Sequence, residues 1–126
     1  MKRVALAVTA AAVGAGLAAP AAIAGGAETH IEFDLIEYVG IEGETVYRGE
    51  IFSDRRKCLL DRKVTVFRKR SGDDLKIGTT EANEDKPGEF GWALYKPGPP
   101  KSGVYYAKAK AITGCLADKS AQYGIG

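Results

Sequence analysis

The chain has 126 residues, with 18 Lys and Arg against 16 Asp and Glu. Lys2 and Arg3 precede an apolar stretch that ends in the small-x-small pattern Ala22-Ile23-Ala24, which is typical of a secretory signal peptide at 1–24. The expected mature domain, 25–126, is formally neutral without those two bases. This balance argues against a general binder of nucleic acids or anionic membranes. The absence of a second long apolar run argues against a membrane protein.

The mature segment alternates polar and apolar residues over most of its length, which predicts β-strands. In 46–52 the apolar set Tyr47, Gly49 and Ile51 is expected to face the core. Later in the chain, Tyr105 and Ala107 should face one side of a strand, and Tyr106, Lys108 and Lys110 the other. The expected strands are 30–35, 46–52, 63–68, 75–79, 90–94, 104–111 and a last one within 116–125, with turns at 40–43 and 71–74.

Seven short strands separated by turn residues indicate a single all-β domain, an antiparallel Greek-key sandwich. A domain of this size has a thin core, and small exported domains often add a disulfide. Cys58 and Cys115 are the two cysteines, so only one intramolecular pairing exists. The export signal favours a Cys58–Cys115 disulfide over two free thiols or an intermolecular bond.

Two stretches carry a resemblance to a known class of module. The segments Gly88-Glu89-Phe90-Gly91-Trp92 and Gly103-Val104-Tyr105-Tyr106-Ala107-Lys108 resemble the second half of prealbumin-like, carboxypeptidase-regulatory-like β-sandwich modules. The first half, 47–53 with Cys58 and 62–64, is similar to small secreted bacterial proteins of unknown function, in which a cysteine after the second strand pairs with one near the C-terminus. The resemblance implies an immunoglobulin-like or prealbumin-like sandwich without enzymatic activity. The longer polar stretch 81–87 departs from the tight turn of those modules.

Gly103 and Tyr105 have a structural interpretation of their own. A Tyr at the start of a strand, two residues after a Gly, can fold its hydroxyl onto the preceding loop as the tyrosine corner of Greek-key sandwiches. An ordinary half-buried Tyr is the alternative.

The residues offer little for catalysis or metal binding. His30 is the single histidine, and it lies close to the expected mature N-terminus, where fraying is common. A Ser-His-Asp site or a three-His zinc site is therefore not expected. The carboxylates around Asp73-Asp74 and at 83–89 match no calcium loop. We therefore assign no catalytic residue, metal ligand or cofactor.

Charge is the most distinctive feature of the sequence. Residues 25–54 carry eight acids and one base, whereas 55–72 carry eight bases and one acid. One interpretation is that the two segments neutralise each other through weak surface ion pairs. The other is a bipolar surface whose basic loop, Arg55-Arg56-Lys57, meets an anionic partner.

Aromatic residues offer a further ligand-binding hypothesis. A thin core cannot hold all of Tyr38, Trp92, Tyr95, Tyr106 and Tyr123, so some of these rings should be exposed. Exposed rings on a sandwich can stack on sugars, and the candidates for this role are Trp92, Tyr95 and Tyr106. Only a contiguous exposed patch would indicate function.

Together these features predict a secreted, non-enzymatic binding or structural module. Its candidate partners are an anionic wall polymer, a glycan or another extracellular protein, with no nucleic acid and no membrane insertion after cleavage. The alternative is a small secreted glycan-active hydrolase or a calcium-dependent carbohydrate-binding module.

Overall fold

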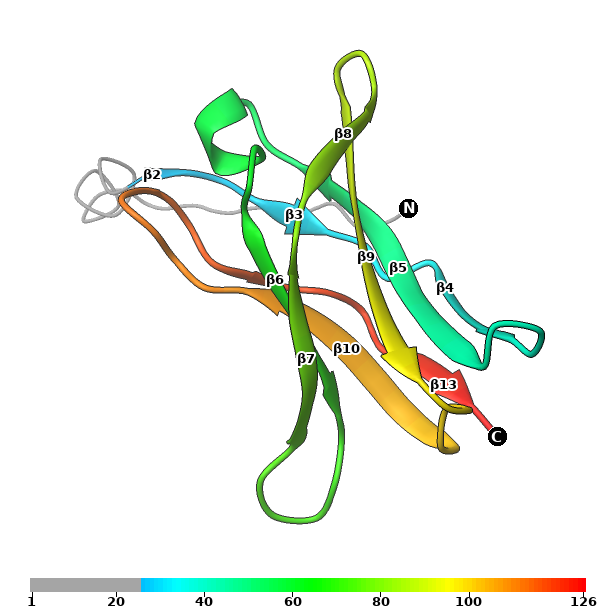
Figure 1. Ribbon diagram of the computed structural model, residues 1–126. Helices are drawn as coiled ribbons and strands as arrows, with labels where there is room; N and C mark the ends of the chain where they lie inside the picture. Colours follow the sequence, from blue (N-terminus) through cyan, green and yellow to red (C-terminus); the bar gives the residue numbers. More distant parts are fainter. Residues whose placement is uncertain (1–25) are drawn as a thin grey trace.

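The computed structural model describes residues 26–126, so the predicted signal peptide at 1–24 and the cleavage point before Gly25 lie outside the described residues. The described part is all-β (Figure 1). None of its helical segments is long and apolar enough to cross a membrane. The strands are β2 (Gly26–Ala27), β3 (His30–Ile31), β4 (Leu35–Val39), β5 (Glu44–Phe52), β6 (Lys63–Arg68), β7 (Leu75–Glu81), β8 (Asn83–Lys86), β9 (Glu89–Pro97), β10 (Gly103–Ala109), β11 (Gly114–Cys115), β12 (Asp118–Lys119) and β13 (Tyr123–Ile125), with a 3-10 turn η2 (Arg56–Cys58).

Two antiparallel sheets form the sandwich. In the first sheet the order is β3-β5-β9-β8, and β4 also pairs with β5. In the second sheet the order is β12-β10-β6-β7, and β13 also pairs with β10. A small parallel pair, β2 with β11, lies apart from both. This order, with β5 beside β9 and β10 beside β6, is that of immunoglobulin-type Greek-key sandwiches, and it confirms the expected fold class.

The described residues contain more strands than the seven predicted, because the edges are divided into short pieces. The expected strand at 30–35 is split into β3 and β4, and the expected last strand is split into β12 and β13. The polar stretch 81–87, which replaces the tight turn of the resembled modules, contains β8. β7 and β8 follow each other as one long ribbon in Figure 1. β7 pairs with β6 in the second sheet, and β8 pairs with β9 in the first. The buried Ala82 lies between them, where the chain changes sheets, as happens at the corners of such sandwiches.

The core lies between the two sheets and follows the predicted alternation. Tyr47 and Ile51 on β5 are buried, as expected for the inward set. The inner faces are completed by residues from β3, β6, β9 and β10: Ile31, Val64, Val66, Phe90, Trp92, Leu94, Tyr105, Ala107 and Ala109.

His30 does not lie in a frayed terminus, contrary to our expectation. It pairs with Phe52 as part of β3. The backbone N–H of the next residue, Ile31, donates a hydrogen bond of 2.8 Å to the Asp118 carboxylate of β12. This contact between the edges of the two sheets holds the segment in place.

Cys58 and Cys115 form the predicted disulfide, with their Cα atoms 5.6 Å apart. Cys58 ends the η2 turn between β5 and β6, and Cys115 lies in β11, between β10 and β12. The bond therefore ties together two loops at one end of the sandwich. A disulfide indicates an oxidising environment.

Candidate functional site

Tyr105 forms the tyrosine corner. Its hydroxyl donates a hydrogen bond of 2.5 Å to the carbonyl of Lys101, in the loop that joins β9 to β10, and the residue is only 1% exposed. Gly103 has φ +142°, and the Arg68 guanidinium crosses it where a side chain would otherwise lie. Both residues are therefore structural, which decides between the two interpretations of Tyr105.

The basic loop Arg55-Arg56-Lys57 forms the η2 region beside the disulfide. Arg56 is already engaged, because its guanidinium pairs with Glu84 at 3.2 Å and lies 5.3 Å from the centre of the Phe90 ring. Arg55 and Lys57 approach Gly114 of β11 instead. The structure therefore divides the three bases, and only Arg55 and Lys57 remain candidates for a ligand at this end.

Arg62, one of the eight bases at 55–72, has a role that the sequence pattern did not predict. Arg62 is 2% exposed. Its Nη1 donates to the Cys58 carbonyl and the Thr29 hydroxyl, and its Nη2 donates to the carbonyls of Lys110 and Leu116, each at 2.9 to 3.1 Å. Burial lowers the pKa of the guanidinium. No local pattern in the sequence signals this role, since three of the four acceptors, on Thr29, Lys110 and Leu116, lie 33 or more residues away.

The aromatic candidates do not form one patch. Trp92 belongs to the core at 3% exposure, and Tyr106 is 6% exposed, so neither ring presents a free face to a sugar. Tyr95 is 57% exposed on β9. Sugar stacking on a group of rings therefore has no support in this arrangement.

Tyr106 is instead the centre of a row on the outer face of the second sheet. Its ring stacks on Phe67 of β6, with centroids 5.3 Å apart, and the Lys119 ammonium lies 4.4 Å above it. Its hydroxyl donates a hydrogen bond of 2.6 Å to Asp74. This bond, with burial, raises the pKa of Tyr106 to about 12.

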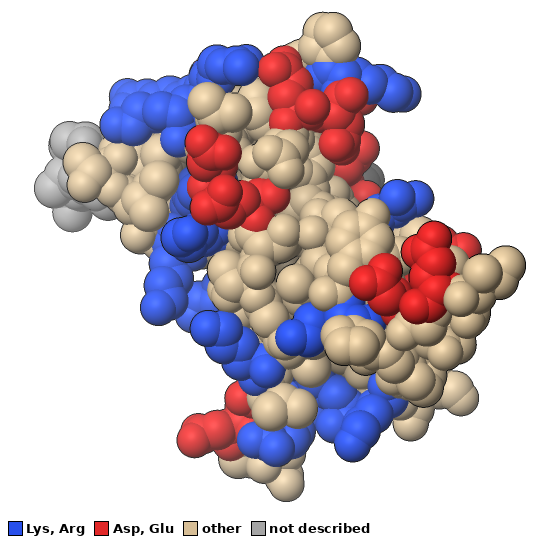
Figure 2. Space-filling view, viewed as in Figure 1, with Lys and Arg blue, Asp and Glu red and all other residues tan. Residues whose placement is uncertain are grey.

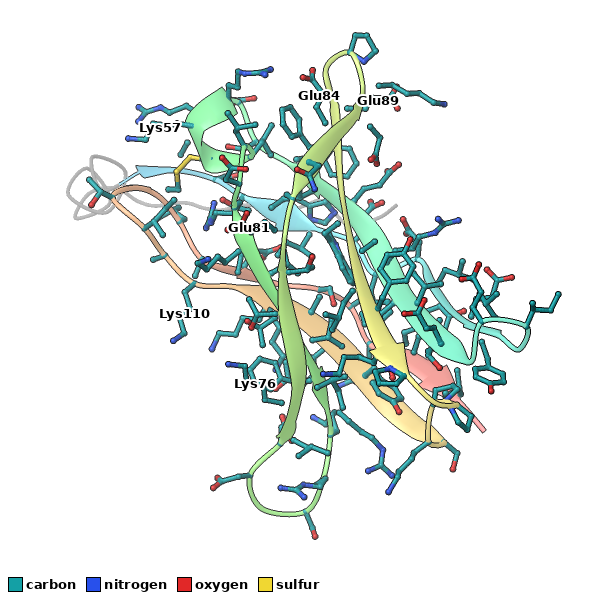
Figure 3. All side chains as sticks on the ribbon, in the orientation of Figure 1. Lys57, Lys76, Glu81, Glu84, Glu89 and Lys110 are labelled. Carbon is teal, nitrogen blue, oxygen red and sulfur yellow. A yellow bond between two sulfur atoms is a disulfide. The ribbon has the colours of Figure 1, made fainter. Side chains whose placement is uncertain are left out.

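Lysines surround this row. Lys108 lies opposite Lys119 in the pairing of β10 with β12, and Lys76 lies opposite Phe67 in the pairing of β6 with β7. Lys110 continues the outward alternation of β10 and is exposed. Figure 3 places Lys76 and Lys110 on the same side of the molecule, and Figure 2 shows basic side chains along that side. We call these four residues, Lys76, Lys108, Lys110 and Lys119, the lysine face.

Carboxylates collect on the first sheet. Oxygen atoms of Glu32, Asp34 and Glu50 lie within 4.8 Å of one another. Partial burial, and then the neighbouring Glu32, raises the pKa of Asp34. The pKa of Glu50 is also raised by burial, and further by four nearby carboxylates: Asp34, Glu32, Glu89 and Asp85. Three surface carboxylates are fewer ligands than calcium takes in a shaped loop, so the group is not assigned as a metal centre.

The two charged segments do not neutralise each other. Within residues 26–126, the ion pairs of Lys and Arg are Arg56 with Glu84 and Lys63 with Glu81, so both acids come from the third quarter of the chain. Among the acids at 28–54, Glu32 is paired, with His30 at 3.4 Å. The charges are therefore separated in space as well as in sequence, which favours the bipolar surface over mutual neutralisation.

Comparison with known proteins gives no match: no family model, curated protein or solved structure is similar to the chain.

Proposed function

We propose that this protein is exported and acts, without catalysis, as a binding module for an anionic extracellular ligand. The observation that carries the proposal is the separation of charge between the sheets. Exposed lysines lie on the outer face of the second sheet, and carboxylates gather on the first. Such an arrangement attracts an anionic partner to one side and repels it from the other, which sets encounter rate and orientation.

The disulfide and the apolar segment at the start of the chain support export. A bond between Cys58 and Cys115 persists in oxidising compartments and is rare in the cytosol. The extracellular ligands that fit are negatively charged wall polymers and glycans, as the sequence predicted.

Salt-dependent retention tests this function. The exported protein should bind cell-wall or extracellular-matrix fractions at about 50 mM salt and be released at higher ionic strength, because Lys contacts with an anionic polymer are screened. Chemical removal of the anionic polymers from the fraction should abolish retention. Protein that flows through every fraction at low salt contradicts the proposal.

A glycan hydrolase is the second candidate, since Asp34 and Glu50 are neighbouring carboxyls with raised pKa values. Paired carboxyls with shifted pKa values are the usual machinery of glycosidases. Both side chains stay largely open to solvent despite this partial burial, however, and repulsion from neighbouring carboxylates adds to the raised pKa of Glu50. Turnover of any glycan that is lost in Glu50→Gln would decide for the hydrolase and against the binding module.

A further inference from the structure

The positive charge of the lysine face is only partly compensated, since Asp74 lies near enough to Lys119 for the lysine to help lower the pKa of its carboxyl. Lys76, Lys108, Lys110 and Lys119 make no ion pair within residues 26–126. Lys108 and Lys119 lie directly opposite each other on adjacent strands. Like charges in this position destabilise a sheet. The pair therefore works against the fold, and a bound anion would relieve the repulsion.

The nearby arginines bind groups of the protein itself. Arg62 donates to three buried carbonyls near the disulfide, and Arg68 donates to the carbonyl of Ser102 at 3.0 and 3.1 Å. Arg56 pairs with Glu84. The bases left to the solvent on the second sheet are thus lysines. A lysine ammonium is a point charge that accepts anions of varied geometry, whereas an arginine fork selects for planar bidentate partners.

The stacked row beneath the lysines gives the face a fixed shape. Phe67 and Tyr106 fill the surface between β6 and β10, and Asp74 anchors the Tyr106 hydroxyl. Lys119 lies across the Tyr106 ring. The row therefore gives Lys119 a packed support, and Lys76 and Lys108 belong to the regular strands beside it.

The spacing of the charges fits a polymer. Lys110 directly follows the end of β10 and is two residues from Lys108, which corresponds to about 6.8 Å along an extended chain. Lys119 adds a charge beside Lys108, and Lys76 adds another across Phe67. One small anion cannot contact all four positions on an open sheet face. A linear chain with negative charges repeated every few ångströms can do so.

We propose that the lysine face binds a linear anionic polymer that lies along β10. This inference rests on the proposed function and deepens it, because it places the ligand on the open face of the second sheet rather than at the basic loop. The carboxylates of the first sheet keep the polymer from binding on the opposite side.

Two double variants with the same change in net charge test the placement. Lys108→Gln/Lys119→Gln removes two charges from the lysine face, and Arg55→Gln/Lys57→Gln removes two from the basic loop. The probes are polygalacturonate, which carries carboxylates, inorganic polyphosphate, which carries phosphates, and monomeric galacturonate. Calorimetry at low salt gives the Kd for each, and thermal unfolding verifies that both variants are folded.

We expect the wild-type protein to bind at least one of the polymers at least tenfold more tightly than the monomer. The lysine-face variant should lose about tenfold in affinity and show a shallower dependence of log Kd on log salt, since fewer cations contact the polymer. The basic-loop variant should lose less than twofold. Equal losses in both variants, a loss only in the basic-loop variant, or binding of the monomer as tight as the polymer would overturn the placement. A wild-type protein that binds neither these polymers nor any extracellular fraction would overturn the proposed function as well.

Discussion

The indole N–H of Trp92 donates a hydrogen bond of 3.1 Å to the carbonyl oxygen of Glu32. This carbonyl lies where Gly49, the residue paired with Trp92, would carry a side chain. The segment between β3 and β4 runs beside β5 at this glycine, and the backbones of Glu32 and Glu50 exchange two hydrogen bonds there. A Cβ atom at Gly49 would overlap the Glu32 carbonyl. The acidic segment 32–34 is thus held against β5 because position 49 has no side chain.

Gly49→Ala should therefore destabilise the domain by about 2 kcal/mol, because the backbone of segment 32–34 must shift to make room for the added Cβ. Chemical denaturation measures this change. Gly40→Ala is the matched control, since its added Cβ would meet only the Tyr38 ring at 3.7 Å, an ordinary contact. Equal stability of the two variants would contradict the proposed close approach.

Tyr105→Phe isolates the tyrosine corner. The ring stays in the core, but the Lys101 carbonyl loses its donor. We expect a loss of about 1 kcal/mol in the free energy of unfolding, the usual contribution of one such hydrogen bond. The same change at exposed Tyr95 should leave stability within experimental error. A Tyr105→Phe protein as stable as the wild type would show that the hydrogen bond to the Lys101 carbonyl does not stabilise the fold.

Alternation in the sequence was sufficient to predict the strands of the core. It gave the inward set of β5 and the outward order of Tyr106, Lys108 and Lys110 on β10, because period two reports burial within a single strand. Alternation did not predict β8, because the residues of this strand are all polar and exposed and so show no apolar face. Nor did it predict the division of the first strand, where the three residues 32–34 lie opposite the two residues Gly49 and Glu50 of β5.

The candidate sites depended on pairings between distant segments. The pairing of Lys108 with Lys119, and of Phe67 with Tyr106, follows from sheet register, which the local pattern does not contain. Arg62 looked like its exposed neighbours because charge gives no sign of burial. The disulfide was predictable, since two cysteines behind a predicted export signal allow one intramolecular pairing.

The pH dependence of stability should show a maximum in mildly acidic solution. The pKa values of Asp34 and Glu50 are raised in the folded state, so folded protein takes up protons before unfolded protein as the pH falls. Unfolding therefore becomes less favourable on going down from neutral pH. The pKa values of Asp74 and Glu84 are lowered, by bonds from Tyr106 and from the Gly88 amide, and their contribution is lost in stronger acid.

Thermal unfolding between pH 3 and 8 at low salt tests this balance, with the highest Tm expected between about pH 4 and 6. Glu50→Gln should raise the Tm at neutral pH and flatten the profile. Glu42→Gln, in the exposed turn after β4, is the control. A Tm that falls steadily from pH 7 to pH 5 would be inconsistent with uncompensated carboxylates on the first sheet.

Reduction of the disulfide should cost much of the domain's stability. Cys58 and Cys115 are 57 residues apart, and opening a loop of that length favours the unfolded chain by roughly 4 kcal/mol on the chain-entropy model. We expect the Tm of a Cys58→Ala/Cys115→Ala variant to fall by about 15 °C or more. Thiol titration of the unreduced, denatured wild type should find no free cysteine. Two titratable thiols in the exported protein would contradict the bond.

Arg62 is expected to be the most sensitive single position at the disulfide end. Arg62→Met keeps the volume of the side chain but leaves the carbonyls of Cys58, Lys110 and Leu116 without this donor in the interior. Because buried acceptors without partners cost more than a hydrogen bond contributes, the free energy of unfolding should fall by about 3 kcal/mol. Arg62→Lys should recover only part of this loss, since a single ammonium group cannot span the acceptors that the planar guanidinium reaches. Urea denaturation of both variants, with Arg55→Met as the exposed control, measures the effect. A loss below 1 kcal/mol in Arg62→Met would contradict a stabilising role for these hydrogen bonds.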